Sequence, residues 1–181
     1  MKSVQVEFLK SAPGLKFFPD LPHPEFAFVG RSNVGKSSLL NMIAGQKNLC
    51  RTGARPGVTQ TVNFFIMNRN TTLVDLPGYG YARVSKTLKK QFQPLVSIYL
   101  QNRGALRLVF LLVDIRRVPG DYEKSIITEC GERNVPVAII ATKCDKLSNN
   151  ALAKQSREIS QALDIDAGSI FLTSSKSGKG K

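Results

Sequence analysis

The amino-acid sequence predicts a three-layer α/β domain, in which helices cover both faces of a mostly parallel sheet. Segments of strand and helix character alternate along the chain, and this implies crossover connections between parallel strands. Two continuous apolar runs, Leu106–Val113 and Val135–Ala141, are typical of strands buried on both faces of a sheet. The 181 residues are 42% hydrophobic and 22% charged, which suits one domain with its own core. We therefore expect a single domain over residues 1–181.

The first half of the chain predicts an edge strand, a loop, a strand–helix unit and a hairpin. Val4–Leu9 alternates polar and apolar residues, as an edge strand does, and four prolines between positions 13 and 24 predict a loop. Residues 1–24 are thus an N-terminal edge strand and proline-rich loop. The other elements expected here are a buried strand at Glu25–Val29, a helix at Ser37–Ala44, a loop at Arg51–Thr59, and strands at Thr61–Met67 and Thr71–Asp75 joined by a turn at Asn68–Asn70.

The second half predicts helices that alternate with parallel strands. A loop begins at Gly78 and leads into a helix that runs to about Tyr99. The elements that follow are a strand at Leu106–Val113, a helix at Gly120–Arg133, a strand at Val135–Ala141, a helix at Asn149–Leu163 and a last strand at Ser169–Leu172. The Thr61–Asp75 hairpin then forms an antiparallel edge on an otherwise parallel sheet.

Composition argues against a membrane, secreted or zinc protein. The longest apolar run, around Leu108–Val113, is far shorter than the roughly 20 residues of a membrane span, and the N-terminus lacks the apolar stretch of a signal peptide. The cysteines Cys50, Cys130 and Cys144 form no CxxC pair, which indicates reduced thiols, and His23 is the only histidine. We expect a cytoplasmic monomer with no membrane partner.

The formal charge of +13 is concentrated in one part of the chain. Between Phe26 and Val113 there are twelve Lys and Arg residues, and Asp75 is the only acid. An even surface charge would serve solubility alone, but this clustering favours a polyanion partner such as RNA. The residues predicted to contact RNA or the ribosome are Arg83, Lys86, Lys89 and Lys90.

Residues Gly30 to Ser37 fit the phosphate-binding pattern GxxxxGK[ST], between an expected strand and an expected helix. Glycines allow backbone N–H groups to point at phosphate oxygens, and the helix that follows presents its positive dipole end. Lys36 supplies a charge for the β- and γ-phosphates, and the Ser37 hydroxyl can bind Mg²⁺. The alternative is a glycine-rich turn without a ligand. The predicted nucleotide contacts are Gly30, Arg31, Ser32, Asn33, Val34, Gly35, Lys36, Ser37 and Ser38.

Residues Asp75, Leu76, Pro77 and Gly78 fit DxxG, which is uninformative alone but gains weight from its position. Asp75 ends an apolar strand, so its carboxylate emerges at the sheet edge that also carries the glycine-rich loop. There it can hold a Mg²⁺-bound water, while the Gly78 N–H reaches the γ-phosphate.

Residues Thr142, Lys143, Cys144 and Asp145 fit [NT]KxD after the second buried strand. The Asp145 carboxylate can accept two hydrogen bonds from guanine, which adenine cannot offer, so the motif selects GTP over ATP. The Lys143 stem can cover the base. The alternative is a polar loop that caps a helix. A backbone N–H for the guanine oxygen is expected from Ser174, Ser175 and Lys176.

In this order the motifs resemble those of the translation-factor-related bacterial GTPases, and most closely the EngB (YihA/YsxC) family of ribosome-biogenesis GTPases. The resemblance runs from about residue 25 to 175. It rests on GRSNVGKSSLLN (30–41), RPGVTQTVNFF (55–65), DLPGYGYA (75–82), TKCDK (142–146) and TSSK (173–176). The strings at 55–65 and 75–82 are specific to the family, and many GTPases share the others.

The resemblance implies a P-loop GTPase domain that hydrolyses GTP with Mg²⁺ and acts in large ribosomal subunit assembly and in normal cell division and septation. It implies that Thr59 ligates Mg²⁺ beside Ser37, and that a second switch begins at Gly78. The first-switch residues it implies in nucleotide contact are Gly57, Val58, Thr59, Gln60 and Thr61. The family ends in a further helix, which we expect this chain to lack after residue 176.

Slow intrinsic hydrolysis is expected, because Tyr79 stands where many GTPases carry a water-orienting glutamine. Asn33 offers a side-chain carbonyl near the β- and γ-phosphates. In similar GTPases such an asparagine accompanies a bound K⁺, although Asn33 can equally brace its own loop. We predict catalytic roles for Lys36, Thr59, Gly78 and Asn33.

Two other functions compete with a GTP-driven switch on ribosomal RNA. A P-loop metabolic kinase or ATPase would bind adenine and would leave Asp145 without a task. A non-hydrolysing scaffold at the division site would not need the clustered basic charge.

Overall fold

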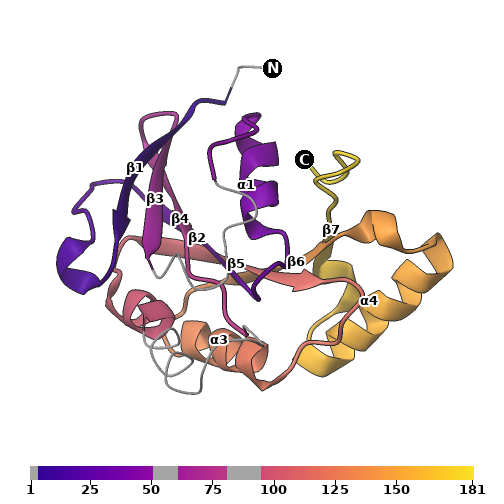
Figure 1. Ribbon diagram of the computed structural model, residues 1–181. Coiled ribbons are helices and arrows are strands. Elements are labelled where there is room, and N and C mark those ends of the chain that lie inside the picture. Colours follow the sequence, from indigo (N-terminus) through magenta and orange to yellow (C-terminus); the bar gives the residue numbers. More distant parts are fainter. Residues whose placement is uncertain (1–3, 51–60, 81–94) are drawn as a thin grey trace.

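The computed structural model describes residues 4–50, 61–80 and 95–181, and they form one seven-stranded sheet with helices on both faces (Figure 1). The strands lie in the order β1-β3-β4-β2-β5-β6-β7. Their bounds are β1 Val6–Ala12, β2 Glu25–Gly30, β3 Val62–Met67, β4 Thr71–Asp75, β5 Leu106–Asp114, β6 Val137–Thr142 and β7 Ile170–Leu172. The helices are α1 Lys36–Ala44, α3 Asp121–Gly131 and α4 Asn149–Leu163, together with helical residues 95–102.

The sheet confirms the predicted mixture of parallel and antiparallel strands. β2 lies parallel to β4 and β5, and β6 lies parallel to β5 and β7. β3 runs antiparallel to both β4 and β1, which makes the antiparallel edge. The element bounds differ by a few residues from those expected. β6 begins at Val137 rather than at Val135 because the Val135 N–H donates to Cys130 O and closes the end of α3.

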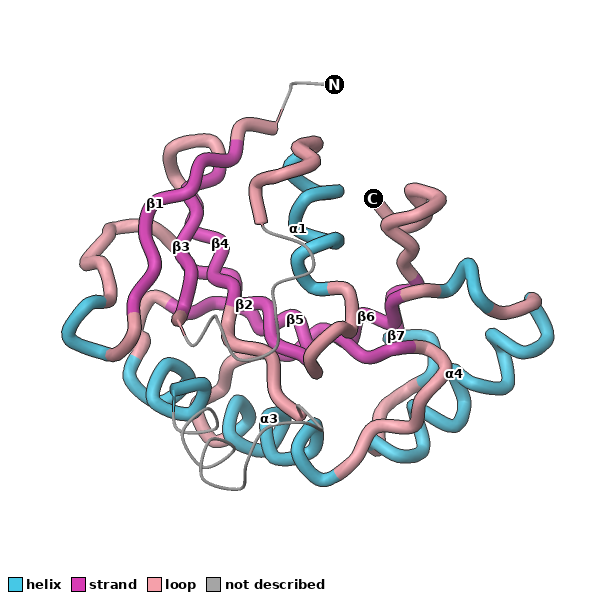
Figure 2. The backbone as a smooth tube through the Cα atoms, in the orientation of Figure 1, coloured by secondary structure: helices cyan, strands magenta, loops and turns pink. Residues whose placement is uncertain are grey.

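Helices lie on both faces of the sheet (Figure 2), and each face carries a hydrophobic core. On one face Leu39, Leu40 and Ala44 of α1 pack against residues of β2, β3 and β5. On the other face helical residues 95–102, α3 and α4 cover the larger core. Covering both faces explains the continuous apolar runs at Leu108–Val113 in β5 and Val137–Ala141 in β6.

Strand β1 contains an irregularity that lets it contribute to both cores. Phe8 pairs with Phe65 and Lys10 pairs with the adjacent Phe64, so Leu9 is an extra residue in the ladder. Before this bulge Val6 points into the α1 core, and after it Ala12 points into the opposite core.

Buried charge anchors the start of β2, at the sheet edge away from the glycine-rich loop. Glu25 is fully buried and accepts hydrogen bonds from Tyr99 Oη at 2.7 Å and from Arg103 Nε at 3.0 Å. Burial, and then the Glu25 charge, raise the pKa of Tyr99 well above its usual value. The contact ties the end of the helix over residues 95–102 to the central strand.

Within the described residues, no helix combines the length and the apolar character that crossing a membrane requires.

Candidate functional site

The carboxyl ends of four parallel strands meet at one edge of the sheet, and a cleft of about 740 Å³ opens beside them. β2 leads into the glycine loop (residues 30–37), β4 ends at Asp75, β5 at Asp114 and β6 at Thr142. Open α/β sheets bind ligands at this kind of edge. The cleft is lined by residues 31–38 of the glycine loop and α1, residues 75–78, Thr61 and Lys143.

The glycine loop curls at the cleft and feeds directly into α1. Gly35 has a φ of 112°, a value that side chains rarely tolerate, and its carbonyl accepts the Leu39 N–H at 2.9 Å to begin the helix. The first N–H groups of a helix lack acceptors within it, so the end of α1 at Lys36–Ser38 is suited to an anion. Local sequence therefore builds the phosphate-type cradle that the motif predicts.

Asp75 and Lys36 form an ion pair inside the cleft, where both side chains are largely shielded. Asn63 Nδ2 lies 3.5 Å from the other Asp75 oxygen. The Ser37 hydroxyl and the Asp75 carboxylate, both of which line the cleft, are oxygen donors of the kind that Mg²⁺ prefers. In the described part of the chain no three His, Cys, Asp or Glu side chains cluster as a metal cage. A Mg²⁺ ion here would thus depend on phosphate oxygens as well.

Gly78 lies against the glycine loop at close range. A Cβ atom on Gly78 would lie 3.2 Å from Ser32 Cα, so glycine is needed for this approach. The adjacent backbone is tied to the loop, because Ser32 N–H donates to Tyr79 O at 2.7 Å. The DxxG segment and the glycine loop therefore form one connected wall of the cleft.

The Tyr79 side chain turns away from the cleft. Its hydroxyl donates to Glu123 on α3 at 2.8 Å, and its ring centroid lies 4.0 Å from that of Tyr122. Burial, and then the Glu123 charge, hold the pKa of Tyr79 well above its usual value. Because Tyr79 does not line the cleft, its phenol does not take the place of the glutamine.

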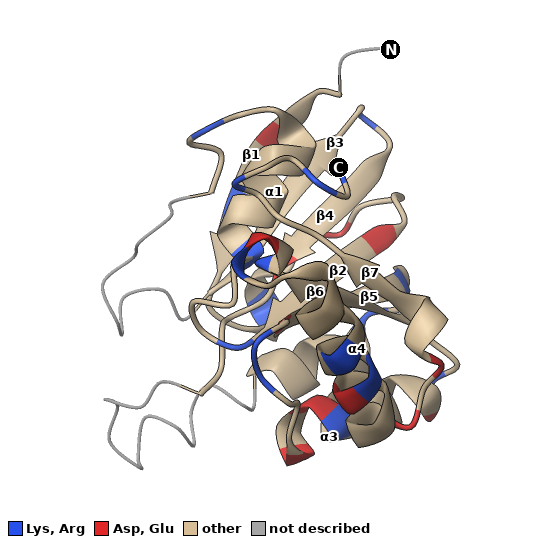
Figure 3. Ribbon diagram, turned by 90° about the vertical axis from the view of Figure 1, so that its right-hand side faces the viewer, with Lys and Arg blue, Asp and Glu red and all other residues tan. Residues whose placement is uncertain are grey.

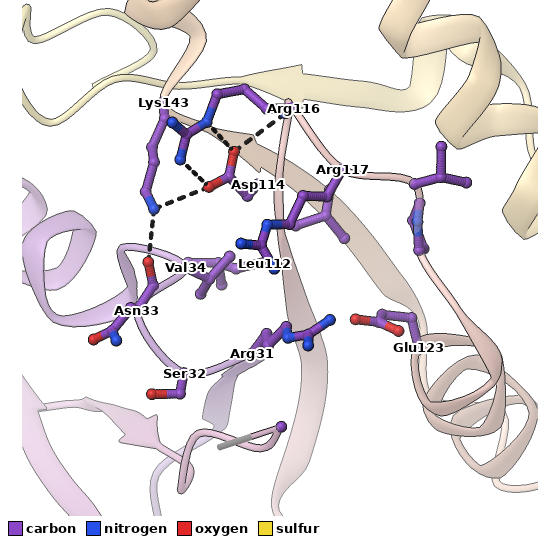
Figure 4. A pocket seen from close by; sticks show the side chains of 14 residues that line it. Arg31, Ser32, Asn33, Val34, Leu112, Asp114, Arg116, Arg117, Glu123 and Lys143 are labelled. Carbon is purple, nitrogen blue, oxygen red and sulfur yellow. Dashed lines mark hydrogen bonds and ion pairs between the residues drawn. The ribbon is translucent and has the colours of Figure 1, made fainter. Parts of the chain in front are cut away.

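The end of β6 and the loop after it are fastened to the glycine loop by two side chains. Thr142 Oγ1 donates to Val34 O at 2.6 Å. Lys143 Nζ donates to Asn33 O at 2.7 Å (Figure 4). Lys143 Nζ also lies 2.9 Å from Asp114 Oδ2. Three segments far apart in sequence therefore meet at the Lys143 ammonium.

Asp145 is oriented by the segment after β7. Ser174 is almost fully buried, and its Oγ donates to Asp145 Oδ1 at 2.7 Å. This bond lowers the pKa of Asp145. The Cys144 N–H donates to Thr173 O at 3.1 Å, which joins the two loops through their backbones as well. Ser175 and Lys176 lie in the exposed turn that follows.

The structure brings most of the predicted residues to one edge of the sheet. Gly30, Thr142, Cys144, Asp145 and residues 174–176 do not line the cleft itself. The predicted residues that do line it are Arg31, Ser32, Asn33, Val34, Gly35, Lys36, Ser37, Ser38, Thr61, Asp75, Leu76, Pro77, Gly78 and Lys143. Outside the described residues lie Gly57, Val58, Thr59, Gln60, Arg83, Lys86, Lys89 and Lys90.

The sequence analysis missed Asp114 and Asn63. Asp114 follows the apolar run Leu106–Val113 and emerges at the same edge as Asp75, so the argument that selected Asp75 applies to it equally. Asn63 faces Asp75 across the β3–β4 hairpin. The predicted turn at Asn68–Asn70 fixes this register, so the hairpin prediction could have identified Asn63 as the neighbour of Asp75.

Comparisons with known proteins agree with this geometry. Residues 25–143 match the family model described as 50S ribosome-binding GTPase. A probable GTP-binding protein EngB of Pelobacter propionicus is 45% identical over 181 residues, which cover all of this chain and 90% of the relative. The corresponding protein of Geobacter sp. strain M21 is 45% identical and is 82% covered, with 97% of this chain matched.

Solved structures share the fold. A crystal structure of a probable GTP-binding protein engB has a TM-score of 0.69 at 24% identity, covering 85% of this chain and 90% of that one. The G domain of the Thermotoga maritima (T. maritima) FeoB iron transporter has a TM-score of 0.53 at 28% identity, covering 87% and 91%. Since close relatives match along the whole chain and the family model spans the nucleotide motifs, this chain belongs to the EngB family of GTP-binding proteins and is a GTPase.

Proposed function

We propose that this GTPase is a molecular switch that binds ribosomal RNA in a precursor of the large ribosomal subunit and acts during its assembly. The observation that carries the proposal is the single sheet edge at which Lys36, Asp75 and Lys143 line one cleft, in a chain that matches a 50S ribosome-binding GTPase family. We further propose that the protein is a cytoplasmic, monomeric, single GTP-binding domain over residues 1–181, and that loss of its activity impairs cell division and septation.

The roles of the site residues follow from their chemistry. Lys36 exchanges its Asp75 partner for the β- and γ-phosphates of GTP, since a phosphate group offers the ammonium more acceptor oxygens than one carboxylate does. The glycine loop and the first turn of α1 bind the phosphates through backbone N–H groups. Gly78 donates its N–H to the γ-phosphate, and Asp145 reads guanine.

Ser37 and Thr59 are the residues that would hold Mg²⁺, and Asp75 lines the cleft together with Ser37. When bound, Mg²⁺ would supply positive charge that offsets the negative charge developing during phosphoryl transfer. The chain itself positions the phosphates and Asp75, and positioning accounts for much of the catalysis of phosphoryl transfer.

A bound K⁺ at Asn33 is proposed as the charge that assists hydrolysis. Asn33 is exposed at the mouth of the cleft, and it is its backbone carbonyl that accepts the Lys143 bond. The hypothesis expects faster GTP hydrolysis in K⁺ than in Na⁺ at matched ionic strength, with the difference abolished by Asn33→Ala. Equal rates of the unaltered protein in both salts would contradict it.

Co-sedimentation with purified ribosomal subunits tests the switch. We expect binding to the large subunit with a non-hydrolysable GTP analogue and weaker binding with GDP, while the small subunit binds weakly in both cases. Asp145→Asn, which disables guanine reading, is the matched control and should lose the difference between the nucleotides. Binding that ignores the nucleotide would favour the scaffold alternative. The metabolic kinase is set aside, because the chain belongs to a GTPase family.

A further inference from the structure

Asp114 lies at the candidate site but belongs to none of the nucleotide-binding motifs. It is the last residue of β5 and pairs with Thr142, the last residue of β6. Lys143 follows Thr142 directly, so the parallel pairing of these strands places the Asp114 carboxylate beside the lysine. Asp114 is only 8% exposed. A carboxylate this well buried needs partners, and both of its oxygens have them.

Arg116 and Lys143 share the Asp114 carboxylate (Figure 4). Arg116 Nε lies 2.9 Å from Oδ1 and Arg116 Nη2 lies 2.7 Å from Oδ2, so the two side chains form a bidentate ion pair. Lys143 Nζ lies 2.9 Å from Oδ2. Burial alone would raise the pKa of Asp114, but hydrogen bonds from Arg116 and Lys143 outweigh it and hold the pKa well below its usual value. Asp114 therefore remains a carboxylate throughout the neutral range.

The Lys143 ammonium is held from its other side by the glycine loop. Nζ donates to Asn33 O at 2.7 Å. Lys143 and Asn33 both have a φ of 61°, a left-handed conformation that asparagine tolerates but that costs energy for lysine. One ammonium thus joins two different segments, and Asp114 is the anion that fixes this ammonium in place.

We propose that Asp114 is a positioning residue for nucleotide binding, which acts by holding Lys143 between the carboxylate and the glycine loop. This inference rests on the proposed contact of the Lys143 stem with the guanine base. A lysine side chain loses much rotamer freedom when it is ordered. Because Asp114 and Asn33 order Lys143 before GTP or GDP arrives, less of that cost falls on binding. Arg116 keeps the carboxylate turned toward the lysine.

A purely local role for Asp114 would look different. Its Oδ1 also accepts the Arg116 backbone N–H at 3.1 Å, and its backbone carbonyl accepts the Arg117 N–H at 2.9 Å. If Asp114 only shaped this turn, replacing it would lower the stability of the protein, and the size of the effect would be the same with or without Lys143. If it acts through Lys143, its effect on affinity must vanish when Lys143 is gone.

A double-mutant cycle on GDP affinity separates the two roles. Lys143→Ala alone tests the proposed contact with the base and should weaken GDP binding. Asp114→Asn replaces one oxygen by an NH₂ donor and should weaken GDP binding about tenfold in the unaltered background, as expected for a lost charged hydrogen bond. In the Lys143→Ala background the same change should cost less than about twofold. Because Lys143 does not touch the reacting phosphate, kcat at saturating GTP should stay unchanged while KM rises.

Arg117→Gln is the matched control, since Arg117 lies beside Arg116 and lines the same small pocket of about 280 Å³, yet within the described residues its side chain makes no ion pair. It should leave GDP affinity unchanged. Asp114→Glu keeps the charge and should restore part of the affinity and of the coupling to Lys143, which guards against a fold defect specific to Asn. Equal losses from Asp114→Asn in both backgrounds would overturn the inference. No loss from Lys143→Ala would overturn the base contact and the inference with it.

Discussion

Tyr79 occupies a sequence position that suggests a role in hydrolysis, but its side chain points away from the cleft. It follows the DxxG motif, but its hydroxyl donates to Glu123 and its ring packs at a tilt against the ring of Tyr122, both on α3. Its backbone carbonyl meanwhile accepts the Ser32 N–H. Tyr79 therefore links α3 to the wall of the cleft, and the group that activates water must be found elsewhere.

Tyr79→Phe removes the hydroxyl and keeps the ring. We expect the free energy of unfolding to fall by about 1 kcal/mol, the usual worth of a buried hydrogen bond, and kcat for GTP hydrolysis to stay the same. Urea denaturation and single-turnover hydrolysis measure these quantities. Tyr122→Phe, in the neighbouring ring, is the control. It should lower the free energy of unfolding by less than Tyr79→Phe does, and it should leave kcat unchanged. A marked drop in kcat for Tyr79→Phe would restore a catalytic role to the phenol.

Asp145→Asn tests the assignment of the base-reading residue. An amide NH₂ can donate to the 2-oxo group of xanthine, where a carboxylate cannot, so preference should move from GDP toward XDP. Competition binding with the two nucleotides measures the change. Ser174→Ala, which removes the hydrogen bond that orients Asp145, should weaken GDP binding without creating a preference for XDP. Unaltered GDP affinity in Asp145→Asn would show that the assignment is wrong.

At the scale of elements, the helix over residues 95–102 is fixed at its end by charge as well as by packing. Tyr99 and Arg103 converge on Glu25, the first residue of the central strand β2. The Glu25–Arg103 hydrogen bond is the main cause of a raised pKa for Arg103. Since Glu25 is fully buried, its ion pair with Arg103 fixes the end of the helix to the sheet.

Glu25→Ala leaves the partly buried Arg103 side chain without its anion. We expect a loss of about 3–5 kcal/mol in the free energy of unfolding, the usual effect of breaking a buried ion pair. Chemical denaturation at a fixed GDP concentration measures it. The double variant Glu25→Ala/Arg103→Leu should recover part of the loss, because the uncompensated charge is gone. If the double variant loses as much stability as Glu25→Ala and Arg103→Leu do when their separate losses are added, the ion pair is not the source of the effect.

The whole molecule shows how much of a fold and a site can be predicted from sequence. The alternation of apolar strands with helices and the glycine loop before α1 are local patterns, so the sheet type and the cradle were predictable. The Asp114–Lys143–Asn33 contact depends on which strands become neighbours. The order of the strands in the sheet depends on burying both faces of the sheet together, so it cannot be predicted from any single segment of sequence.

The net charge of +13 is also a property of the whole molecule, and it is unevenly placed. Basic and acidic residues lie together on α4, where Lys154 Nζ and Glu158 Oε1 are 4.0 Å apart (Figure 3). The small pocket next to the cleft is lined by four basic residues and two acidic ones, namely Arg31, Arg116, Arg117, Lys143, Asp114 and Glu123. The excess of positive charge there would draw a polyanion toward the nucleotide side.

The proposed binding to the large subunit should therefore weaken steeply with salt. Log affinity is expected to fall by roughly 0.7–0.9 per unit of log salt for each phosphate neutralised. Changing Arg83, Lys86, Lys89 and Lys90 to Ala should flatten the slope while GTP affinity remains unchanged. Lys154→Ala/Arg157→Ala on α4 is the control and should leave the slope as it was. An unaltered slope in the fourfold variant would move the contact surface to other basic residues.

The extra residue in β1 has a consequence for the tolerated length of the chain. Pairing on both sides of Leu9 is already that of a strand one residue shorter, since Phe8 and Lys10 face consecutive residues of β3. A chain that lacks one residue between Val6 and Ala12 can pair regularly with β3 and still keep these two residues in their separate cores. A chain that lacks two residues there would turn one of them to the wrong face. This edge of the sheet can thus lose a single residue, and natural variation in length should be found within β1.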